Sequence, residues 1–366
     1  MIKECKKPIL GWKWFIYFIS CIAIIAMSSA LVIFLIDPCF QYRVKNNSLF
    51  FFERYVGPGL ISNYDYDTLV IGSSRVQNFD MDLFREKLNV KPLLIGIGGL
   101  QINDLTRLVE KANSVGRAKT YYICIDLSMF IDDRQLVPDY LYDEDTISRG
   151  KYMTSYEVWF RFIPMDFGVK TAKAVGIELK PEFTDKMNID KFADWSNRVN
   201  FSEDTVIEDF LKNRNITSVS DQVDKECSMT LMKANIENFV SGLGDGEKYV
   251  FFFSPYSALW WCNTEDNGTD GQYYELKKYF VDHVPDNSLI YDFQYADVTL
   301  DLNNYCDLGH YGPDVNDWMI EQFANPYSEF IVNSDNIEEK IDILRENIVR
   351  FKEDHAILWS DEQSVY

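Results

Sequence analysis

Hydrophobic positions divide the chain into an apolar N-terminal segment and a longer region where short apolar runs alternate with amphipathic stretches. No charged residue interrupts Trp14–Ile36. As a helix, this run would be about 34 Å long and would span the roughly 30 Å hydrocarbon core of a bilayer. Trp12 and Tyr17 lie where interfacial aromatic residues are expected. We therefore predict a single transmembrane anchor over residues 14–36.

Lysines precede the apolar run, at Lys3, Lys6, Lys7 and Lys13. Cytoplasmic flanks of membrane helices are enriched in positive charge, so residues 1–13 are predicted to be a cytoplasmic tail. Everything after Asp37 would then be extracytoplasmic. A cleaved signal peptide is the alternative, because Ser28–Ala30 is rich in small residues. The apolar run continues to Ile36, however, which is longer than a usual signal core.

From Thr68 onwards, short apolar runs have the composition of strands buried on both faces. These runs are Thr68–Ile71, Leu93–Ile97, Tyr121–Leu127, Tyr249–Phe253 and Leu289–Phe293. Helical patterns separate several of them, at Met81–Leu88, Ile102–Val115 and Tyr273–Val284. The alternation predicts an α/β three-layer sandwich with a parallel five-stranded, flavodoxin-like sheet. It also places a site at the carboxyl edge of the strands.

The same pattern suggests the domain boundaries. Residues 37–63 are interpreted as a juxtamembrane connector, residues 64–330 as the α/β domain, and residues 331–366 as a C-terminal helix over Asn336–Lys352 with a tail. Within the domain, residues 131–246 are predicted to be a helical insertion after the third strand. Such an insertion rises from the active-site edge and would be either a substrate cap or a scaffold elaboration without a direct role.

The insertion begins with an acidic loop and continues with amphipathic stretches at Tyr156–Val175 and Ser202–Asn213. The loop carboxylates are Asp132, Asp133, Asp139, Asp143, Glu144 and Asp145.

Charge narrows the range of partners. The 366-residue chain carries a formal charge of −21, which argues against nucleic acid and against an anionic lipid surface as partners of the folded part. It has only three histidines, and no residue spacing is typical of a metal site or calls for a cofactor. If the domain is exported, Cys262 and Cys306 are the cysteines to test for a disulfide, since both follow strands. Cys5 and Cys21 belong to the tail and the anchor.

Asp307 and His310 form the first candidate for catalysis. They are three residues apart, ahead of a helix predicted to start at Pro313. In a turn, the carboxylate of Asp307 can hold one imidazole nitrogen of His310 and leave the other as a base. A polar turn that feeds a helix is the alternative interpretation.

Ser74 is the candidate nucleophile. Gly72-Ser73-Ser74 ends the first predicted strand, where free backbone N–H groups stabilise negative charge. A strand-to-helix turn with a serine cap is the structural alternative. Cys306, beside Asp307, is a second candidate nucleophile, but it lacks this position at the end of a first strand.

Together these motifs resemble those of the SGNH (GDSL-type) hydrolase superfamily. The third residue of the Gly-Asp-Ser block is its nucleophile, which matches Ser74, with Ser73 in place of the aspartate. Its Asp-x-x-His block matches Asp307 and His310. The chain is most similar to membrane-anchored bacterial members, such as the D-alanine transfer protein of teichoic acids and the alginate O-acetylation proteins. Those proteins often work beside a membrane-bound O-acyltransferase.

The resemblance also implies an oxyanion hole, in which the backbone of Ser74 and a glycine would take part. Gly98 and Gly99 are the best candidates, although Gly96 lies nearby. The Gly-x-Asn block expected after the third strand is replaced by Ile125-Asp126-Leu127-Ser128. Loss of one such donor costs about 2.7–4 kcal/mol of transition-state stabilisation, so efficient hydrolysis without a partner is in doubt.

Other residues near the predicted edge are candidates for substrate binding. Arg75 is positioned to steer an anionic group, or alternatively to form a salt bridge at a helix start. Tyr256 and Ser257 follow the fourth strand and, with Trp260 and Trp261, would form a wall for stacking sugars. Packing of these aromatic residues in the core is the alternative.

The resulting expectation is a serine esterase or O-acyltransferase anchored in the cell membrane. It would act on ester-linked acyl groups of an extracytoplasmic cell-envelope polysaccharide or polymer. The first alternative is a non-catalytic polysaccharide-binding or scaffold protein that partners a membrane-bound O-acyltransferase. A secreted lipase is a further alternative, but it would require a more apolar site than this acidic chain suggests.

Overall fold

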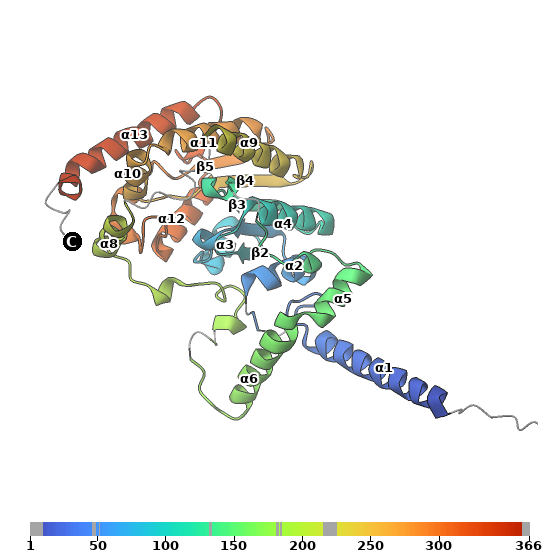
Figure 1. Cartoon of the computed structure of the whole chain (residues 1–366). Helices are drawn as coiled ribbons and strands as arrows, with labels where there is room; N and C mark the ends of the chain where they lie inside the picture. Colours follow the sequence, from blue (N-terminus) through green and yellow to red (C-terminus); the bar gives the residue numbers. More distant parts are fainter. Residues whose placement is uncertain are drawn as a thin grey trace, which may run out of the picture.

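The chain folds into a mixed α/β domain with a mostly parallel six-stranded sheet and a long apolar N-terminal helix (Figure 1). The computed structural model describes residues 10–45, 49–50, 52–131, 134–180, 183, 185–214 and 225–360. The predicted loop residues Asp132 and Asp133, the lysines before Leu10 and Cys5 lie outside this part. So do the last residues of the predicted tail.

The sheet has the strand order β2-β1-β3-β4-β5-β6. Its strands are β1 (Thr68–Gly72), β2 (Pro92–Gly96), β3 (Thr120–Cys124), β4 (Lys248–Phe253), β5 (Leu289–Asp292) and β6 (Ile331–Val332). The first five are the predicted parallel strands, in the order of flavodoxin-like folds. The prediction of five strands was wrong at one edge, where β6 pairs antiparallel with β5. A two-residue strand has no recognisable sequence pattern.

Side chains alternate between two helix-covered faces of the sheet. On one face, Phe84 and Phe323 pack around Tyr122 of β3. On the other, Phe280 packs on Phe251 of β4. These aromatic residues come from α3 (Met81–Leu88), α12 (Pro313–Ala324) and α11 (Asp270–His283). α4 (Ile102–Val115) and α9 (Lys225–Ser241) complete the second layer. The predicted helices at 81–88 and 102–115 coincide with α3 and α4.

The predicted anchor is a helix, α1 (Leu10–Ile36). Within the described part of the chain, Trp12–Ile36 is one helix that is long and apolar enough to cross a membrane, and its side chains are mostly exposed. At its end, the buried carboxylate of Asp37 accepts hydrogen bonds from the backbone of Gln41, Tyr42 and Arg43. This turn connects α1 firmly to the domain.

The segment interpreted as a connector is partly a core element. α2 (Glu53–Asn63) packs against β2 and α4 and buries Gly57-Pro58-Gly59. A Cβ atom at Gly59 would lie 2.1 Å from the Cys39 carbonyl oxygen, so only glycine allows the Asp37 turn to approach the helix. Gly-Pro-Gly normally indicates a loop, which is why the pattern suggested a connector.

The region between β3 and β4 has two parts. One part forms a lobe with α5 (Thr146–Thr154), the π-helical turn η4 (Val158–Phe162) and α6 (Ile163–Ala174), and its chain then returns past the sheet edge to α8 (Glu203–Asn213). The other part is α9, which packs on α4 and α11. α9, although it lies within the predicted insertion, therefore belongs to the layer that covers the sheet.

The C-terminal part closes the other end of the domain. α13 (Ile337–Asp354) packs on α11 and on α10 (Ala258–Asp266), close to the predicted helix at 336–352. Cys262 and Cys306 are both free thiols, one buried and the other half-buried. The disulfide considered from the sequence is therefore absent between them.

Candidate active site

Ser74 is presented by a tight turn at the carboxyl end of β1. Ser73 caps the short 3₁₀ helix Ser74–Val76, and its hydroxyl oxygen accepts a hydrogen bond from the Arg75 N–H at 3.4 Å. A Cβ atom at Gly72 would lie only 2.6 Å from Cβ of Cys124. Glycine at this position therefore lets β1 end close beside β3 and turn sharply into Ser74.

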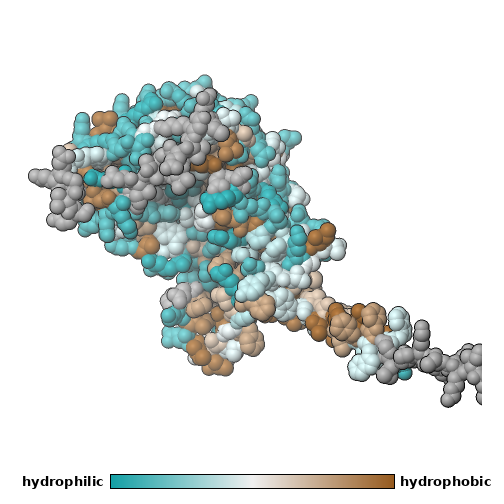
Figure 2. All heavy atoms as spheres, viewed as in Figure 1, coloured by the Kyte–Doolittle hydropathy of each residue, from teal (hydrophilic) through white to brown (hydrophobic). Residues whose placement is uncertain are grey.

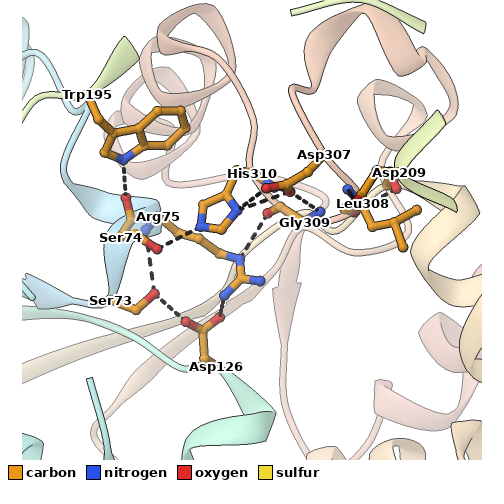
Figure 3. A network of polar contacts seen from close by, with 11 residues as sticks. Ser73, Ser74, Arg75, Asp126, Trp195, Asp209, Asp307, Leu308, Gly309 and His310 are labelled. Atoms are coloured by element: carbon orange, nitrogen blue, oxygen red, sulfur yellow. Dashed lines mark hydrogen bonds and ion pairs between the residues drawn. The ribbon is translucent and has the colours of Figure 1, made fainter. Parts of the chain in front are cut away.

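The structure brings Ser74, His310 and Asp307 into one hydrogen-bonded row (Figure 3). Ser74 Oγ lies 2.7 Å from His310 Nε2, across 236 positions of sequence. His310 Nδ1 lies 2.7 Å from Asp307 Oδ2. The turn after β5 therefore reaches the end of β1 at the carboxyl edge of the parallel strands, as the sequence predicted.

The turn itself holds Asp307 and His310 in place. The Asp307 carboxylate accepts hydrogen bonds from the backbone N–H groups of Gly309 and His310, both at 2.8 Å. Burial alone would raise the pKa of Asp307, but the hydrogen bonds and charge of His310 together with these N–H groups lower it below 3.8. An ionised carboxylate can only accept, so Nδ1 of His310 carries the proton and Nε2 is free to accept from Ser74.

A second polar cluster lies directly beneath Ser74. Asp126, just beyond β3, accepts hydrogen bonds from the Ser73 hydroxyl and from the Tyr256 hydroxyl, the latter at 2.9 Å. It also forms an ion pair with Arg75 at 2.7 Å. Burial alone would lower the pKa of Arg75, but the charge of Asp126 outweighs it and raises this pKa. Arg75 also donates to the Gly309 carbonyl at 3.0 Å, so this cluster connects the nucleophile turn to the histidine turn.

Glycine at position 309 is required for this connection. A Cβ atom there would lie 2.7 Å from Nη2 of Arg75. The guanidinium group also stacks on the ring of Tyr256 at 4.4 Å. Arg75 is thus held on several sides, which agrees with the alternative interpretation of a salt-bridged arginine.

Trp195, from the returning chain of the insertion, covers the site. Its indole N–H donates to the Ser74 carbonyl at 3.0 Å. Its ring meets the His310 imidazole edge-on, with centroids 5.5 Å apart. Figure 3 shows the indole above Ser74 on the side opposite Asp126. The insertion therefore contributes directly to the site, as a cap would.

The backbone N–H groups of Ser74 and of the glycine turn after β2 are the candidates for the oxyanion donors that the resemblance implies. Gly98 and Gly99 form the turn after β2, and Gly99 has φ +68°, a conformation that favours glycine. Within the described residues, the N–H groups of Ser74, Gly98 and Gly99 have no hydrogen-bond acceptor. Gly98 also lines the cavity beside the site, which makes it the better placed of the two glycines.

The remaining candidate residues are buried around the site. Tyr256 is bound to Asp126, and Ser257 donates to the Leu308 carbonyl at 2.7 Å. Trp261 packs parallel to Tyr274 in the core. Ser257 and Tyr256 therefore support the turns that carry the catalytic candidates, rather than forming an open stacking wall.

Cys306 is a poor competitor for the role of nucleophile. Burial, with a further contribution from the charge of Asp307, raises the pKa of its thiol to about 12. The thiolate is the reactive form of cysteine, so at neutral pH Cys306 is unreactive. Ser74 is the residue that contacts the His310 imidazole.

A cavity of about 380 Å³ opens beside the triad, a size suited to a small ligand. Its walls come from the start of α2, the catalytic edge and the insertion, and comprise Phe52, Glu53, Arg54, Gln77, Gly98, Met165, Phe183, Lys186, Ala193, Trp195 and Arg198. Trp195 both lines this cavity and contacts Ser74 and His310, which are not themselves among the lining residues. The lining contains three cations and one carboxylate, so its net charge is positive although the chain as a whole is acidic.

Sequence reasoning did not find Asp126 or Trp195 as members of the site. A carboxylate inside the apolar run Ile125-Asp126-Leu127 was a usable signal, because a buried charge needs a partner. Trp195 lies in a segment without a recognisable pattern, so no local signal could have identified it.

No known protein-family model matches this chain, and no curated protein matches its sequence. The function must therefore be argued from the chemistry of the site itself.

Proposed function

We propose that this protein is a membrane-anchored serine acyltransferase or esterase of the SGNH type. It would act on ester-linked acyl groups of an extracytoplasmic cell-envelope polymer. The observation that carries the proposal is the 2.7 Å contact between Ser74 Oγ and His310 Nε2, with Asp307 on the opposite imidazole nitrogen. A nucleophile, a base and an orienting carboxylate in this order are the elements of acyl-serine chemistry.

In the first half-reaction, Nε2 of His310 takes the Ser74 hydroxyl proton while Oγ bonds to the carbonyl carbon of the donor ester. The tetrahedral intermediate then expels the donor alcohol, which receives the proton from His310. In the second half-reaction, His310 takes the proton of an acceptor hydroxyl while the acceptor oxygen attacks the acyl carbon, and the Ser74 Oγ that leaves receives this proton back from His310. A polymer hydroxyl as acceptor gives transfer, and water gives hydrolysis.

Asp126 and Arg75 would position the nucleophile in this reaction. Asp126 binds Ser73 directly before the nucleophile, and Arg75 directly after it also binds the carbonyl of Gly309. Both turns of the triad are therefore fixed to one buried ion pair. Neither residue needs to contact the substrate for this role.

The negative oxygen of the intermediate would be stabilised by the backbone N–H groups of Ser74 and Gly98. Asp126 occupies the strand end where the resemblance expects an asparagine donor, and its carboxylate has no proton to offer an oxyanion. Because one donor is typically worth about 2.7–4 kcal/mol, we expect slow reaction with water. A bound acceptor, held in the cavity or supplied by a partner acyltransferase, would favour transfer.

Labelling with a fluorophosphonate probe tests the proposal in the full-length chain. Wild type should form a covalent adduct, and Ser74→Ala should form none because the attacking oxygen is gone. Ser128→Ala is a matched control, since Ser128 is an exposed serine after β3 and its loss should leave labelling intact. Labelling that persists in Ser74→Ala would contradict the assignment of the nucleophile.

A second function, a non-catalytic scaffold that partners a membrane-bound O-acyltransferase, is favoured by one observation. Asp126 takes the place of the expected oxyanion donor. If well-folded wild type with a native unfolding profile does not react with the probe, this function becomes the better one. Ser74, His310 and Asp307 would then be present without catalysing a reaction.

A further inference from the structure

Strongly exposed apolar side chains outside α1 concentrate on the lobe that carries α5 and α6. Six large ones, between 59 and 72% exposed, lie within one short stretch of chain. They are Ile147, Tyr156, Phe160, Phe167, Val175 and Ile177. Figure 2 shows brown residues gathered at the end of this lobe and along α1, whereas most of the visible domain is teal. A surface of this kind marks an interaction site.

The exposed residues form a stripe along one side of the helix. Phe160, Pro164, Phe167 and Thr171 follow one another by three or four residues, and all are exposed. Val169, on the opposite side, is buried. Positions spaced in this way share one face of a helix. The exposed face of α6 is therefore largely uncharged. Lys170 lies at its margin, in an ion pair with Asp166, whereas Lys173 lies nearer the side of Val169 and is 3.9 Å from the Met187 sulfur.

The stripe has a fixed orientation relative to the domain. Phe162 of η4 is buried and packs against Tyr55 and Phe52 of the α2 region, with ring centroids 4.9 and 5.7 Å apart. Arg161 stacks on the outer side of Phe52 at 3.9 Å. These contacts hold η4, and α6 after it, to the core.

α6 also lies beside the C-terminal end of α1, where the apolar run stops. The two helices are in contact. Arg43 donates to the Phe34 carbonyl at 2.7 Å, and Lys45 donates to the Leu35 carbonyl. Cations at such a helix end mark the depth of lipid headgroups. Lys45 is close enough to Lys170 for the two charges to interact, so the middle of α6 lies at this depth.

We propose that the exposed face of α6 together with its flanking turns, comprising Pro164 and Phe167 of α6, Phe160 of η4 and the adjoining Tyr156, Val175 and Ile177, inserts into the lipid interface of the bilayer that α1 spans. The occupant is the phospholipid surface itself. An interfacial helix of this kind buries its apolar face roughly 5–10 Å into the headgroup and acyl boundary. Lys170, at the margin of this face, would extend to the phosphates. Insertion is driven by apolar burial, and the acidic chain as a whole contributes no attraction to anionic lipid.

This contact would attach the protein to the membrane at two places, α1 and α6. It would also fix the distance between the cavity and the bilayer surface. Met165, on the inner side of α6, lines the cavity together with Phe52. The cavity is therefore built on the same helix that meets the lipid. Ligands would enter it from close to the membrane surface, whatever reaction Ser74 performs.

Fluorescence quenching tests the inference in the full chain, reconstituted in phosphatidylcholine vesicles that contain brominated lipids. Phe167→Trp places a reporter at the centre of the face and replaces one exposed aromatic residue by another, so the fold is retained. The added emission should be quenched, and more strongly by bromines near the headgroup end of the acyl chain than by bromines near its methyl end. The chain has eight tryptophans, including Trp12 and Trp14 in α1 and Trp159 in η4, so each variant is compared with the parent chain and only the added emission is interpreted.

Tyr327→Trp is the matched control, because Tyr327 is a 91% exposed aromatic residue in the loop after α12. Its added emission should not be quenched. If the parent tryptophans are quenched but Phe167→Trp is quenched no more than Tyr327→Trp, α1 is inserted without α6, and the inference is overturned. A protein partner would then be the occupant to seek.

Discussion

Asp307 is the residue on which the geometry of His310 most depends. It accepts from the ring and from the backbone of the same histidine, so one carboxylate sets the tautomer, the ring orientation and the turn. Its neighbour Cys306 has no comparable function, since its thiol is held protonated by burial.

Replacement of the Asp307 carboxylate by an amide should separate its role in positioning His310 from its role in setting which imidazole nitrogen carries the proton. Asp307→Asn can donate to Nδ1, which would move the proton to Nε2 and remove the base. We expect the rate of fluorophosphonate labelling to fall by up to about 10⁴-fold, as in other triads. Asp297→Asn is the control, because Asp297 is an exposed carboxylate and its loss should leave the rate unchanged. Equal rates in both variants would exclude Asp307 from the triad.

The lowered pKa of Asp307 also predicts a pH dependence of stability. A carboxyl group whose pKa is lower in the folded state than in the unfolded state stabilises the fold above its unfolded value. This contribution should be constant above the ordinary value of 3.8 and be lost as the pH falls through the lower folded value. Denaturant unfolding of wild type and Asp307→Asn across this range measures the difference. A difference that grows as the pH falls would contradict the assignment.

Among the secondary-structure elements, α11 is fixed to β5 by a buried ion pair. Lys277 Nζ lies 2.9 Å from Asp292 Oδ2, and the two side chains are 0 and 1% exposed. Burial lowers the pKa of Lys277, while Asp292 opposes this effect. The pair takes no part in the triad. It holds α11 to β5, the strand that precedes the histidine turn.

Removal of one partner should therefore be costly. Lys277→Met leaves the Asp292 carboxylate buried without a counter-charge, and we expect a loss of about 3–5 kcal/mol in the free energy of unfolding. Lys278→Met on the same helix breaks an exposed pair with Glu338 and should cost about 0–1 kcal/mol. Chemical denaturation monitored by circular dichroism measures both. Similar losses in the two variants would show that burial of the pair is unimportant.

For the whole molecule, charge is distributed unevenly in a way that bears on substrate choice. The chain carries −21 overall, yet Arg54, Lys186 and Arg198 line the cavity against one carboxylate, Glu53. Glu53 is 3.9 Å from Lys186 and also interacts with the charges of Arg54 and Arg198, so three cations share one carboxylate and an excess of positive charge is left to attract an anionic group. A cationic cavity in an acidic protein focuses anionic ligands there.

We therefore predict that the site favours an anionic ester. The comparison uses phenyl acetate and its para-carboxylate derivative, with kcat/KM measured for each. Arg198→Gln should reduce the preference for the anionic ester by up to about fivefold, the value of one partly exposed ion pair. Arg345→Gln, an exposed arginine of α13 paired with Asp342, should leave the preference unchanged. Equal turnover of both esters contradicts the role of the cavity, whereas no turnover of either contradicts the proposed function.

The sequence by itself determined the elements whose physics is local. Apolar runs fixed the parallel strands β1 to β5 and the long helix α1, because burial on both faces and membrane span both require uninterrupted apolar residues. It also pointed to Ser74, Asp307 and His310, because their motifs resemble those of a known superfamily and follow strands that end at the same edge of the sheet. Gly57-Pro58-Gly59 suggested a connector, but these residues lie in a core helix. Tertiary packing stabilises this helix although its residues have weak helical propensity.

Only the tertiary structure decided which side chains meet. The contact of Asp126 with Ser73 and Arg75, the placement of Trp195 over Ser74 and His310, and the pairing of β6 with β5 all join residues far apart in the chain. Such contacts depend on the packing of the whole domain and leave no periodic trace in the sequence. The exposed face of α6 is similar, because a helical pattern reveals an apolar stripe but not whether the domain covers it.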